Sequence, residues 1–252
     1  MTDLAIALQR LRMPHSVAAL PKLLEHARRD ECSHEEMLAR LIETELFGRE
    51  QQKIERRIKA AHFPMLKSLE EFDFSFQTSV KKQVVLHLAG LDFIREHSNV
   101  ILVGPPGTGK THLSIALGLK ACQAGYRVWF VTAVSLVAQL LEAQRAERLP
   151  VFLRRLRHCD VLIVDEIGYI PFDQRAANLF FQVITQRYET GSLIVNSNRA
   201  FSGWGEIFAG DPIVAAAMID RLVHHAEILS LKGASYRLRG KEGVTSQSLI
   251  KA

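Results

Sequence analysis

The first sixty residues place apolar and charged side chains with the period of an α-helix. Ser33 and Glu36 form the S-x-x-E pattern of a helix N-terminus, in which each side chain accepts a hydrogen bond from a backbone N–H of the first turn. Apolar residues then recur at three- and four-residue spacing, at Leu38, Leu41, Ile42 and Leu46. We expect this helix to end near Pro64 and a shorter helix to precede Pro14. The pattern predicts a small N-terminal helical domain over residues 1–67.

Beyond residue 67 the pattern changes to short apolar runs that are separated by helix-length segments. Four of these runs are rich in β-branched residues, at 100–103, 128–132, 161–164 and 193–196. Runs that are apolar on both faces are typical of strands in a parallel sheet covered by helices on both sides. The sequence therefore predicts an α/β domain over residues 68–252, in which a parallel sheet is flanked by helices.

Composition is compatible with packed domains and excludes several classes of protein. Of the 252 residues, 48% are hydrophobic and 23% are charged, which excludes global disorder. No apolar run approaches the roughly 18 residues of a membrane-spanning helix, and the first residues lack the apolar core of a signal peptide. Three scattered cysteines argue against a disulfide framework or a zinc site. We expect a cytoplasmic protein with no membrane partner.

Basic residues are gathered in two parts of the chain, which carries a net charge of +5. Charge alone does not separate an ordinary solvated surface from a nucleic-acid-binding one, but local clusters favour nucleic acid, because Lys and Arg neutralise phosphates. The first cluster contains Arg145, Arg148, Arg154, Arg155 and Arg157. The second contains Arg221, Lys232, Arg237, Arg239, Lys241 and Lys251.

Residues 104–111 read G-x-x-x-x-G-K-T, between an expected strand and an expected helix, which is the context of a phosphate-binding loop. Glycines let backbone N–H groups turn toward a phosphate, and the helix N-terminus adds partial positive charge. Lys110 is placed to reach the β- and γ-phosphates, and the Thr111 hydroxyl to bind Mg²⁺. The sequence thus predicts a nucleotide site formed by Gly104, Pro105, Pro106, Gly107, Thr108, Gly109, Lys110 and Thr111.

Two further strands are expected to end in polar side chains beside this loop. The run 161–164 is followed by Asp165 and Glu166, which places two carboxylates at the carboxyl edge of the sheet, where open α/β sheets hold ligands. Asp165 is predicted to hold Mg²⁺ and Glu166 to deprotonate the attacking water. A kinase for small molecules needs no such glutamate, so hydrolysis is favoured. The run 193–196 also ends in polar residues that can reach the γ-phosphate or this water.

Taken together, the motifs resemble those of the AAA+ ATPases, in the branch that contains DnaA and the helicase loader DnaC. The similarity is most specific to the IstB family of ATP-binding helpers in insertion-sequence transposition. It is carried by residues 41–64, 68–74, 99–118, 187–208 and 216–239, and thus extends over nearly the whole chain. The resemblance implies an ATPase with a P-loop AAA+ core and with ATP and Mg²⁺ as cofactors.

The resemblance also assigns roles to residues outside the P-loop. Phe72 and Phe74 lie in the linker that runs close to the adenine in such proteins. Asn198 matches the sensor asparagine, whereas Asn196 stands where related sequences usually carry threonine, so its role stays open. Arg221 occupies the position of the arginine finger, a cation that offsets transition-state charge in the site of a neighbouring subunit.

DNA binding and self-assembly are expected on the same basis. Residues 133–157 occupy the place of the helical insertion that DnaA-like proteins direct at DNA, so Arg145, Arg148, Arg154 and Arg155 are candidate contacts. Only 31 residues follow Arg221, too few for the helical lid of a typical AAA+ protein, and the IstB and DnaC families share this truncation. Without a C-terminal lid, activity is expected to depend on neighbouring subunits in a ring or helix.

The resemblance implies an ATPase that assembles on duplex DNA and assists an IstA-type transposase in target-site selection. A DnaC-like helicase loader is the alternative, although the N-terminal region matches the IstB pattern and lacks the spaced cysteines of some loaders. A phosphotransferase for small molecules is disfavoured by Glu166 and Arg221. A module that binds ATP without hydrolysing it is disfavoured by the complete set from Lys110 to Glu166.

Overall fold

A computed structural model describes residues 3–29, 32–208 and 210–239 of the chain. It divides into two compact units, Met1–Arg56 and Arg57–Ala252. Among the described residues, no helix combines the length and the apolar character that a membrane span requires.

The N-terminal unit is helical. It contains α1 (Asp3–Arg10), α2 (Pro14–Arg29) and the first part of α3 (His34–Ala60). The predicted capping box of α3 is present, because the Ser33 backbone N–H donates to Glu36 Oε2 at 2.9 Å and the Glu36 N–H donates to Ser33 Oγ at 3.2 Å. A small core of Ala5, Leu8, Leu20 and Leu41 holds the three helices together.

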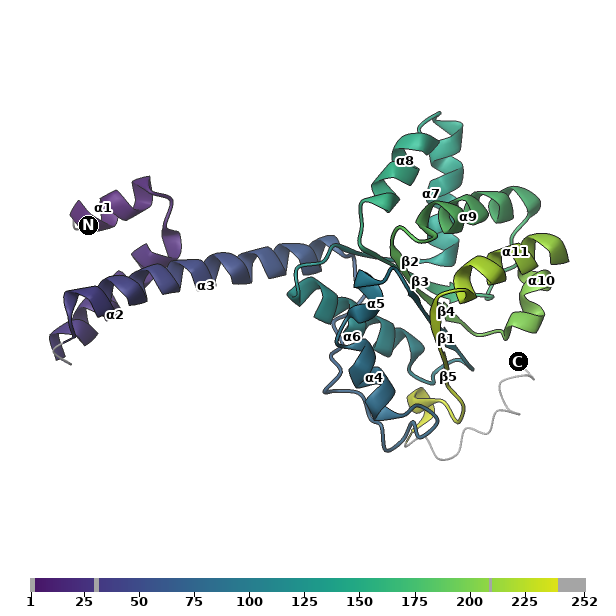
Figure 1. The fold of residues 1–252 in the computed structure, drawn as a ribbon, viewed down its shortest axis with the longest axis horizontal. Helices are drawn as coiled ribbons and strands as arrows, with labels where there is room; N and C mark the ends of the chain where they lie inside the picture. The colour runs from purple at the N-terminus through teal and green to yellow at the C-terminus, as the bar shows by residue number, and fades with distance from the viewer. Residues whose placement is uncertain (1–2, 30–31, 209, 240–252) are drawn as a thin grey trace. The chain divides into compact units, whose positions relative to one another are not determined.

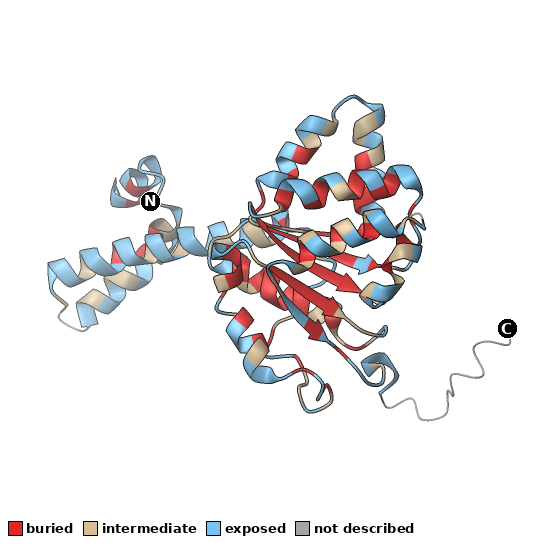
Figure 2. Cartoon of the chain, turned by 45° about the vertical axis from the view of Figure 1, so that its right-hand side comes forward, coloured by how far each residue is buried: buried red, intermediate tan, exposed pale blue. Residues whose placement is uncertain are grey.

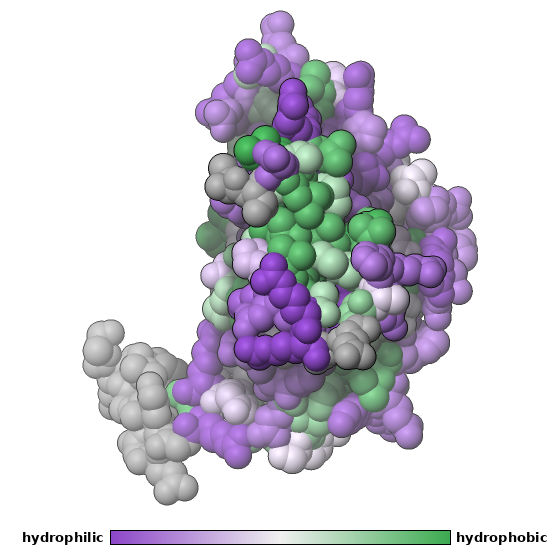
Figure 3. All heavy atoms as spheres, turned by 90° about the vertical axis from the view of Figure 1, so that its left-hand side faces the viewer, coloured by the Kyte–Doolittle hydropathy of each residue, from purple (hydrophilic) through white to green (hydrophobic). Residues whose placement is uncertain are grey.

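Apolar side chains remain exposed in this unit. Of the stripe predicted on α3, Leu41 is buried, whereas Leu38, Ile42 and Leu46 are 58%, 50% and 62% exposed. Figure 3 shows hydrophobic residues gathered in one area of the face in view. The helical spacing therefore predicted the helix correctly, but most of its stripe is not covered by α1 and α2.

The second unit is built on a five-stranded sheet in which every pairing is parallel, with the order β2-β3-β4-β1-β5 (Figure 1). The strands are β1 (Asn99–Val103), β2 (Val128–Thr132), β3 (Val161–Ile167), β4 (Ser192–Ser197) and β5 (Ala226–Ser230). The four predicted strands are confirmed. The edge strand β5 was not predicted, because only Leu229 is buried in it and its composition does not read as an apolar run.

Helices cover both faces of the sheet, as Figure 2 shows by the red strands between two helical layers. Alternate strand residues point to opposite faces. Ile101 and Leu162 belong to one core, and Val100 and Ile163 belong to the other. The helices are α4 (Lys82–Leu88), α5 (Asp92–Arg95), α6 (Lys110–Gln123), α7 (Ala133–Arg145), α8 (Leu149–Arg157), α9 (Gln174–Arg187), α10 (Trp204–Ile207) and α11 (Pro212–Val223).

Residues 57–67 pack with the second unit, although the sequence places the domain boundary near residue 67. Ala61 is fully buried in the core that also contains the P-loop helix, and Ile58 and Phe63 pack against this core. The Phe130 N–H of β2 donates to the Ala61 carbonyl oxygen at 2.8 Å. The end of α3 and the turn after it thus contribute to the core on which the site is built.

Candidate nucleotide site

The P-loop connects β1 to α6, whose first helical residue is Lys110. Gly107 and Gly109 have φ angles of 80° and 99°, a region that side chains rarely adopt. A Cβ at Gly109 would lie 2.6 Å from the Phe72 ring, so the loop needs glycine there for space as well. The loop therefore has the local conformation that the sequence motif predicts.

Lys110 is buried and turned back onto its own loop. Its Nζ donates to the carbonyl oxygens of Gly104 at 2.6 Å and Pro105 at 2.8 Å. Burial lowers the pKa of Lys110, the charge of Asp165 acts in the opposite direction, and the nearby Arg237 lowers the pKa further. A cation held in this setting is more stable beside an added anion than without one.

Thr111 and Asp165 meet although they are 54 residues apart. The Thr111 hydroxyl donates to Asp165 Oδ2 at 2.9 Å, and Asn196 Nδ2 donates to Asp165 Oδ1 at 2.9 Å. Asn196 also donates to Ser114 Oγ at 2.9 Å, which ties β4 to α6. A hydroxyl beside a carboxylate is an oxygen donor set that suits Mg²⁺. Asn196, whose role the sequence left open, therefore orients the carboxylate that would hold the metal.

Glu166 stands next to Asp165 in a strained part of β3. Its φ is 63°, and the register between β3 and β4 shifts between Val164 and Ile167. The Glu166 side chain is exposed, unlike the rest of this strand. Left-handed backbone at a non-glycine residue costs free energy and is concentrated at functional sites. The bulge turns the Glu166 side chain out of the sheet, toward the cavity that it lines.

Asn198 follows the end of β4 and lines the same cavity. Its Oδ1 is buried and, within the described residues, has no hydrogen-bond partner. Gly168 leaves the space for this amide, because a Cβ there would lie 2.7 Å from Asn198 Oδ1. Among the described residues, Asn196 Oδ1 is also buried without a partner, but Asn196 Nδ2 makes its two hydrogen bonds to protein atoms. A buried amide oxygen without a protein partner is available to a water or to another donor.

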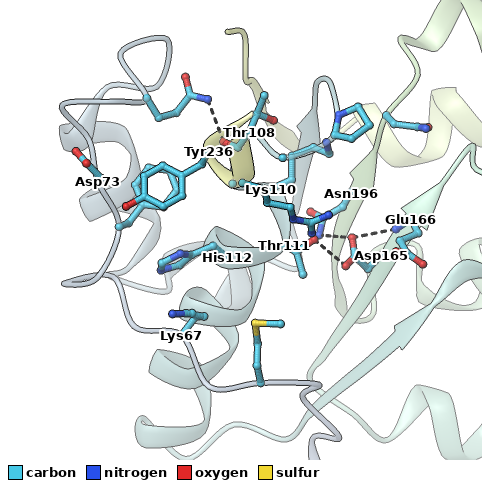
Figure 4. Close-up of a pocket in the computed structure, with 18 of the residues that line it drawn as sticks. Lys67, Asp73, Thr108, Lys110, Thr111, His112, Asp165, Glu166, Asn196 and Tyr236 are labelled. Carbon is cyan, nitrogen blue, oxygen red and sulfur yellow. Dashed lines mark hydrogen bonds between the residues drawn. The ribbon is translucent and has the colours of Figure 1, made fainter. Parts of the chain in front are cut away.

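These groups line a cavity of about 320 Å³ (Figure 4). In Figure 4 Thr111, Asp165, Glu166 and Asn196 lie together, and Tyr236 and Asp73 lie on the other side of Lys110. The residues at the predicted phosphate end are therefore brought together by the carboxyl ends of β1, β3 and β4, which are neighbours in the sheet.

The predicted adenine residues differ in position. Phe72 lines the cavity, but Phe74 is not among the lining residues and instead packs against the core, with its ring 4.8 Å from that of Phe72. A contact of either ring with adenine stays a prediction. The linker also contributes Phe76 and Gln77 to the cavity, and Gln77 Nε2 donates to the Thr108 carbonyl oxygen at 2.9 Å.

Two further lining residues, Tyr236 and Arg237, were not predicted. They belong to the short 3₁₀ helix η2 (Tyr236–Leu238), which follows β5. In the sequence Arg237 stands out only as a member of a basic cluster. A prediction of β5 would have located Arg237, because this strand brings the segment after it to the carboxyl edge of the sheet.

Arg221 does not line the cavity of its own chain. It lies near the end of α11, with its guanidinium 4.7 Å from the centre of the Phe181 ring and a long hydrogen bond from Nη1 to the Ala217 carbonyl oxygen. The adjacent Leu222 carbonyl accepts a hydrogen bond from Asn99 Nδ2 at 2.9 Å. Asn99 opens β1, so α11 is fixed to the end of this strand that is distant from the P-loop.

The first basic cluster lies on the hairpin of α7 and α8. Leu153 and Leu156 of α8 are buried against the core, and the arginines between and beyond them are exposed. The guanidinium of Arg155 lies 4.7 Å from the centre of the Trp129 ring. The exposed set comprises Arg145, Arg148, Arg154, Arg155 and Arg157. Lys241 and Lys251 of the second cluster lie outside the described residues.

A family model and similar sequences place this chain in the same protein family. The sequence model of one family, described as IstB-like ATP binding protein, matches residues 6–244. The chain is 46% identical over 241 residues to the insertion sequence IS21 putative ATP-binding protein of Pseudomonas aeruginosa, covering 96% of this chain and 91% of that protein. It is 42% identical over 232 residues to the IS5376 protein of Geobacillus stearothermophilus, covering 92% of each.

Solved structures share the fold of the second unit. The DnaC helicase loader aligns with a TM-score of 0.51 at 20% identity, covering 70% of this chain and 99% of that one. AMPPCP-bound DnaA from Aquifex aeolicus aligns with a TM-score of 0.54 at 20% identity, covering 70% of this chain and 54% of that one. These alignments confirm the predicted P-loop AAA+ architecture.

Proposed function

This chain belongs to the family of IstB-like ATP-binding proteins of insertion sequences, and from this premise we propose that it is an ATPase that assembles on duplex DNA and assists a transposase in choosing a target site. The observation that carries the proposal is the meeting of Lys110, Thr111 and Asp165 at one edge of the sheet. A site of this composition suits the phosphates and the metal of ATP·Mg²⁺.

In the proposed reaction each group has one task. Lys110 exchanges its carbonyl partners for the β- and γ-phosphates, and Thr111 and Asp165 would hold Mg²⁺, which supplies positive charge to the phosphates. Glu166 accepts the proton of the attacking water, and the free amide of Asn198 orients this water or the γ-phosphate. Arg221 lies outside the cavity of its own chain, and as the proposed arginine finger it serves the pocket of a neighbouring subunit.

Each proposed site combines residues of two subunits, so the active protein is an assembly of several chains. A contact that brings Arg221 of one subunit to the pocket of the next is heterologous, so it generates rings or helices rather than closed pairs. The arginines of the α7–α8 hairpin are the proposed DNA contacts, because they are exposed cations gathered on one element. ATP is expected to promote assembly, DNA to template it and hydrolysis to dissolve it.

The helicase loader is the second candidate, since DnaC shares the fold. At 20% identity this likeness concerns the fold alone, whereas the family match extends over residues 6–244 and includes the N-terminal helices. We therefore favour the transposition helper. The partner is proposed from the insertion-sequence relatives, as a transposase of the IstA type.

Electron microscopy of the purified protein with duplex DNA tests the proposal, with ATP·Mg²⁺ present or absent. We expect ordered rings or filaments on DNA only with ATP, and none with Lys110→Ala. Assembly that ignores ATP would contradict the proposal. Stable binding to a replicative helicase, with no ATP-dependent assembly on duplex, would favour the loader.

A further inference from the structure

The ends of helices α9 and α11 meet at the edge of the sheet opposite the P-loop and bring three metal-ligating side chains together. The two helices lie side by side (Figure 1). Glu189 lies in the turn between α9 and β4, and His224 and His225 join α11 to β5. Two ring nitrogens and one carboxylate oxygen of these residues lie within 4.8 Å of one another. The sequence shows only an adjacent histidine pair, and the fold supplies the third ligand.

The backbone under these side chains is held in place. The His225 carbonyl oxygen accepts a hydrogen bond from the Asn99 N–H at 2.7 Å, which fixes it to β1. The turn that contains Glu189 is held by Arg187, a buried side chain that donates to the Ser192 carbonyl oxygen at 2.8 Å. The side chains themselves are accessible, since those of His225 and Glu189 are 52% and 59% exposed. The ligand positions are therefore fixed, while the side chains remain free to rotate.

The imidazole of His224 is oriented by an aromatic neighbour. The Tyr188 hydroxyl lies 2.6 Å from His224 Nδ1, and the two rings are stacked with their centres 5.9 Å apart. The rings of His224 and His225 are 4.2 Å apart, and His225 Nε2 lies 3.8 Å from Glu189 Oε1. Histidines that bind metals are commonly oriented by a hydrogen bond to the second ring nitrogen. Tyr188 is placed to provide this bond for His224.

The donor set and its spacing suit a transition metal. The ligand bonds of tetrahedral Zn²⁺ are about 2.0–2.1 Å long, so its ligand atoms lie about 3.4 Å apart. Rotation of exposed side chains can bring the three atoms from their present spacing to this distance. Imidazole nitrogen suits Zn²⁺, whereas Mg²⁺ prefers oxygen. An ordinary ion pair would explain Glu189 and His225, but it needs no second imidazole at the same point.

We propose that Glu189, His224 and His225 bind one Zn²⁺ ion, with water in the fourth position, and that this ion fastens the end of α9 to the end of α11. The binding does not depend on the proposed function. Arg221 lies about one helical turn before His224 on α11. Under the proposed function, the ion would therefore hold the end of the helix that presents this arginine to a neighbour.

Isothermal titration with Zn²⁺ tests the proposal on the full chain, purified without a histidine tag and freed of metal by a chelator. We expect one ion per chain. Replacing His224 and His225 together with Ala should weaken binding at least about 100-fold, and Glu189→Gln should weaken it about 10-fold, because ligands are removed. The matched controls are His158→Ala and Cys32→Ser, an imidazole and a thiol outside the cluster, which should bind within about twofold of the parent.

Two further measurements identify the kind of site. Co²⁺ in place of Zn²⁺ should give the strong visible absorption of a four-coordinate ion in the parent, and this band should be absent from the double histidine variant. Zn²⁺ should raise the melting temperature of the parent and not that of this variant, because an ion that binds only the folded chain stabilises it. Excess Mg²⁺ should not displace Zn²⁺.

Several results would overturn the proposal. These are Zn²⁺ binding only at millimolar concentration, equal binding by the parent and the folded double variant, displacement by Mg²⁺, and a ratio of one ion to two chains, which would place the site between subunits. If the double variant does not fold, Glu189→Gln decides, because it keeps the size of the side chain. Lys110→Ala should bind Zn²⁺ like the parent, so a failure of the nucleotide site leaves this test unaffected.

Discussion

Strand β5 has an arginine beyond each of its ends, and the two arginines have different surroundings. Arg221 precedes the strand, on α11, and packs over Phe181 away from the cavity of its own chain. Arg237 follows the strand and lines that cavity. Because β5 runs parallel to β1, its carboxyl end is at the P-loop edge of the sheet and its amino end is at the opposite edge.

One short strand thus places two identical side chains at opposite edges of the sheet. In the sequence both arginines belong to one basic cluster. In the fold, the direction of β5 places Arg237 at the cavity of its own chain and Arg221 away from it.

The largest expected effect, on ATP turnover, concerns Arg221, which precedes β5. Arg221→Ala should bind ATP normally but lose about 10³-fold in turnover, since a cation that offsets transition-state charge is removed. Mixing it with Glu166→Gln chains should restore some activity, because one kind of interface then combines an intact base with an intact arginine. No recovery in subunits that co-assemble would mean that Arg221 acts within its own chain or is structural.

A slightly smaller effect on turnover is expected for Glu166, at the carboxyl edge of the sheet. Glu166→Gln should bind ATP with unchanged affinity and hydrolyse it about 10²- to 10³-fold more slowly, because the amide keeps the size of the side chain and loses the base. Single-turnover hydrolysis and nucleotide titration measure the two quantities separately. An equal loss of binding and turnover would contradict the role of a base.

A moderate effect on DNA binding is expected from substitutions in the α7–α8 hairpin, which lies at neither end of β5. Replacing Arg145, Arg148, Arg154 and Arg155 with Ala should weaken duplex binding to a similar extent on unrelated sequences. It should also reduce the slope of log affinity against log salt by about one for each arginine that no longer pairs with a DNA phosphate. The ATP affinity without DNA should not change. Unchanged DNA binding would move the DNA surface to another part of the chain.

The smallest expected effect is on stability. It concerns the ion pair between Arg239 and Asp73, which attaches the segment after β5 to the linker. The pKa of Asp73 is lowered to about 2, from an ordinary value of 3.8, so its ion pair stabilises the fold above pH 4 and is lost as the pH falls toward 2. Asp73→Asn should therefore melt slightly lower than the parent at pH 6, and the difference should shrink between pH 4 and pH 2. A difference that is constant over this range would exclude the carboxylate charge as its cause.

Most of the sheet and of the phosphate end could be predicted from the sequence, for a physical reason. Buried parallel strands are continuous apolar runs, and the P-loop needs glycines and a lysine at fixed spacing, so both leave a pattern in the chain. Asp165 directly follows the apolar run 161–164, and Asn198 directly follows β4, although its role as a sensor is implied only by the resemblance. The meeting of Thr111 with Asp165 at 2.9 Å is a consequence of strand order, which follows from the resemblance and not from local spacing.

The features that the sequence did not predict depend on an edge strand of the sheet and on the packing of individual side chains. Strand β5 is half exposed and contains Glu227, so it has no apolar run, and without it the place of Arg237 could not be inferred. Phe72 and Phe74 are equivalent in the sequence, and only the packing against His112 and the core places one of them at the cavity. The exposed stripe of α3 has the same spacing as a buried one, since periodicity marks an apolar face without saying what covers it.

The hydrogen bonds of Asn99 give strand β1 a mechanical role. Asn99 binds the Leu222 carbonyl at one end of the strand, and the strand leads into Gly104 at the other, about 16 Å away. In the proposed assembly, strand β1 therefore sets the distance between a subunit's own P-loop and the end of α11 that carries the arginine offered to its neighbour.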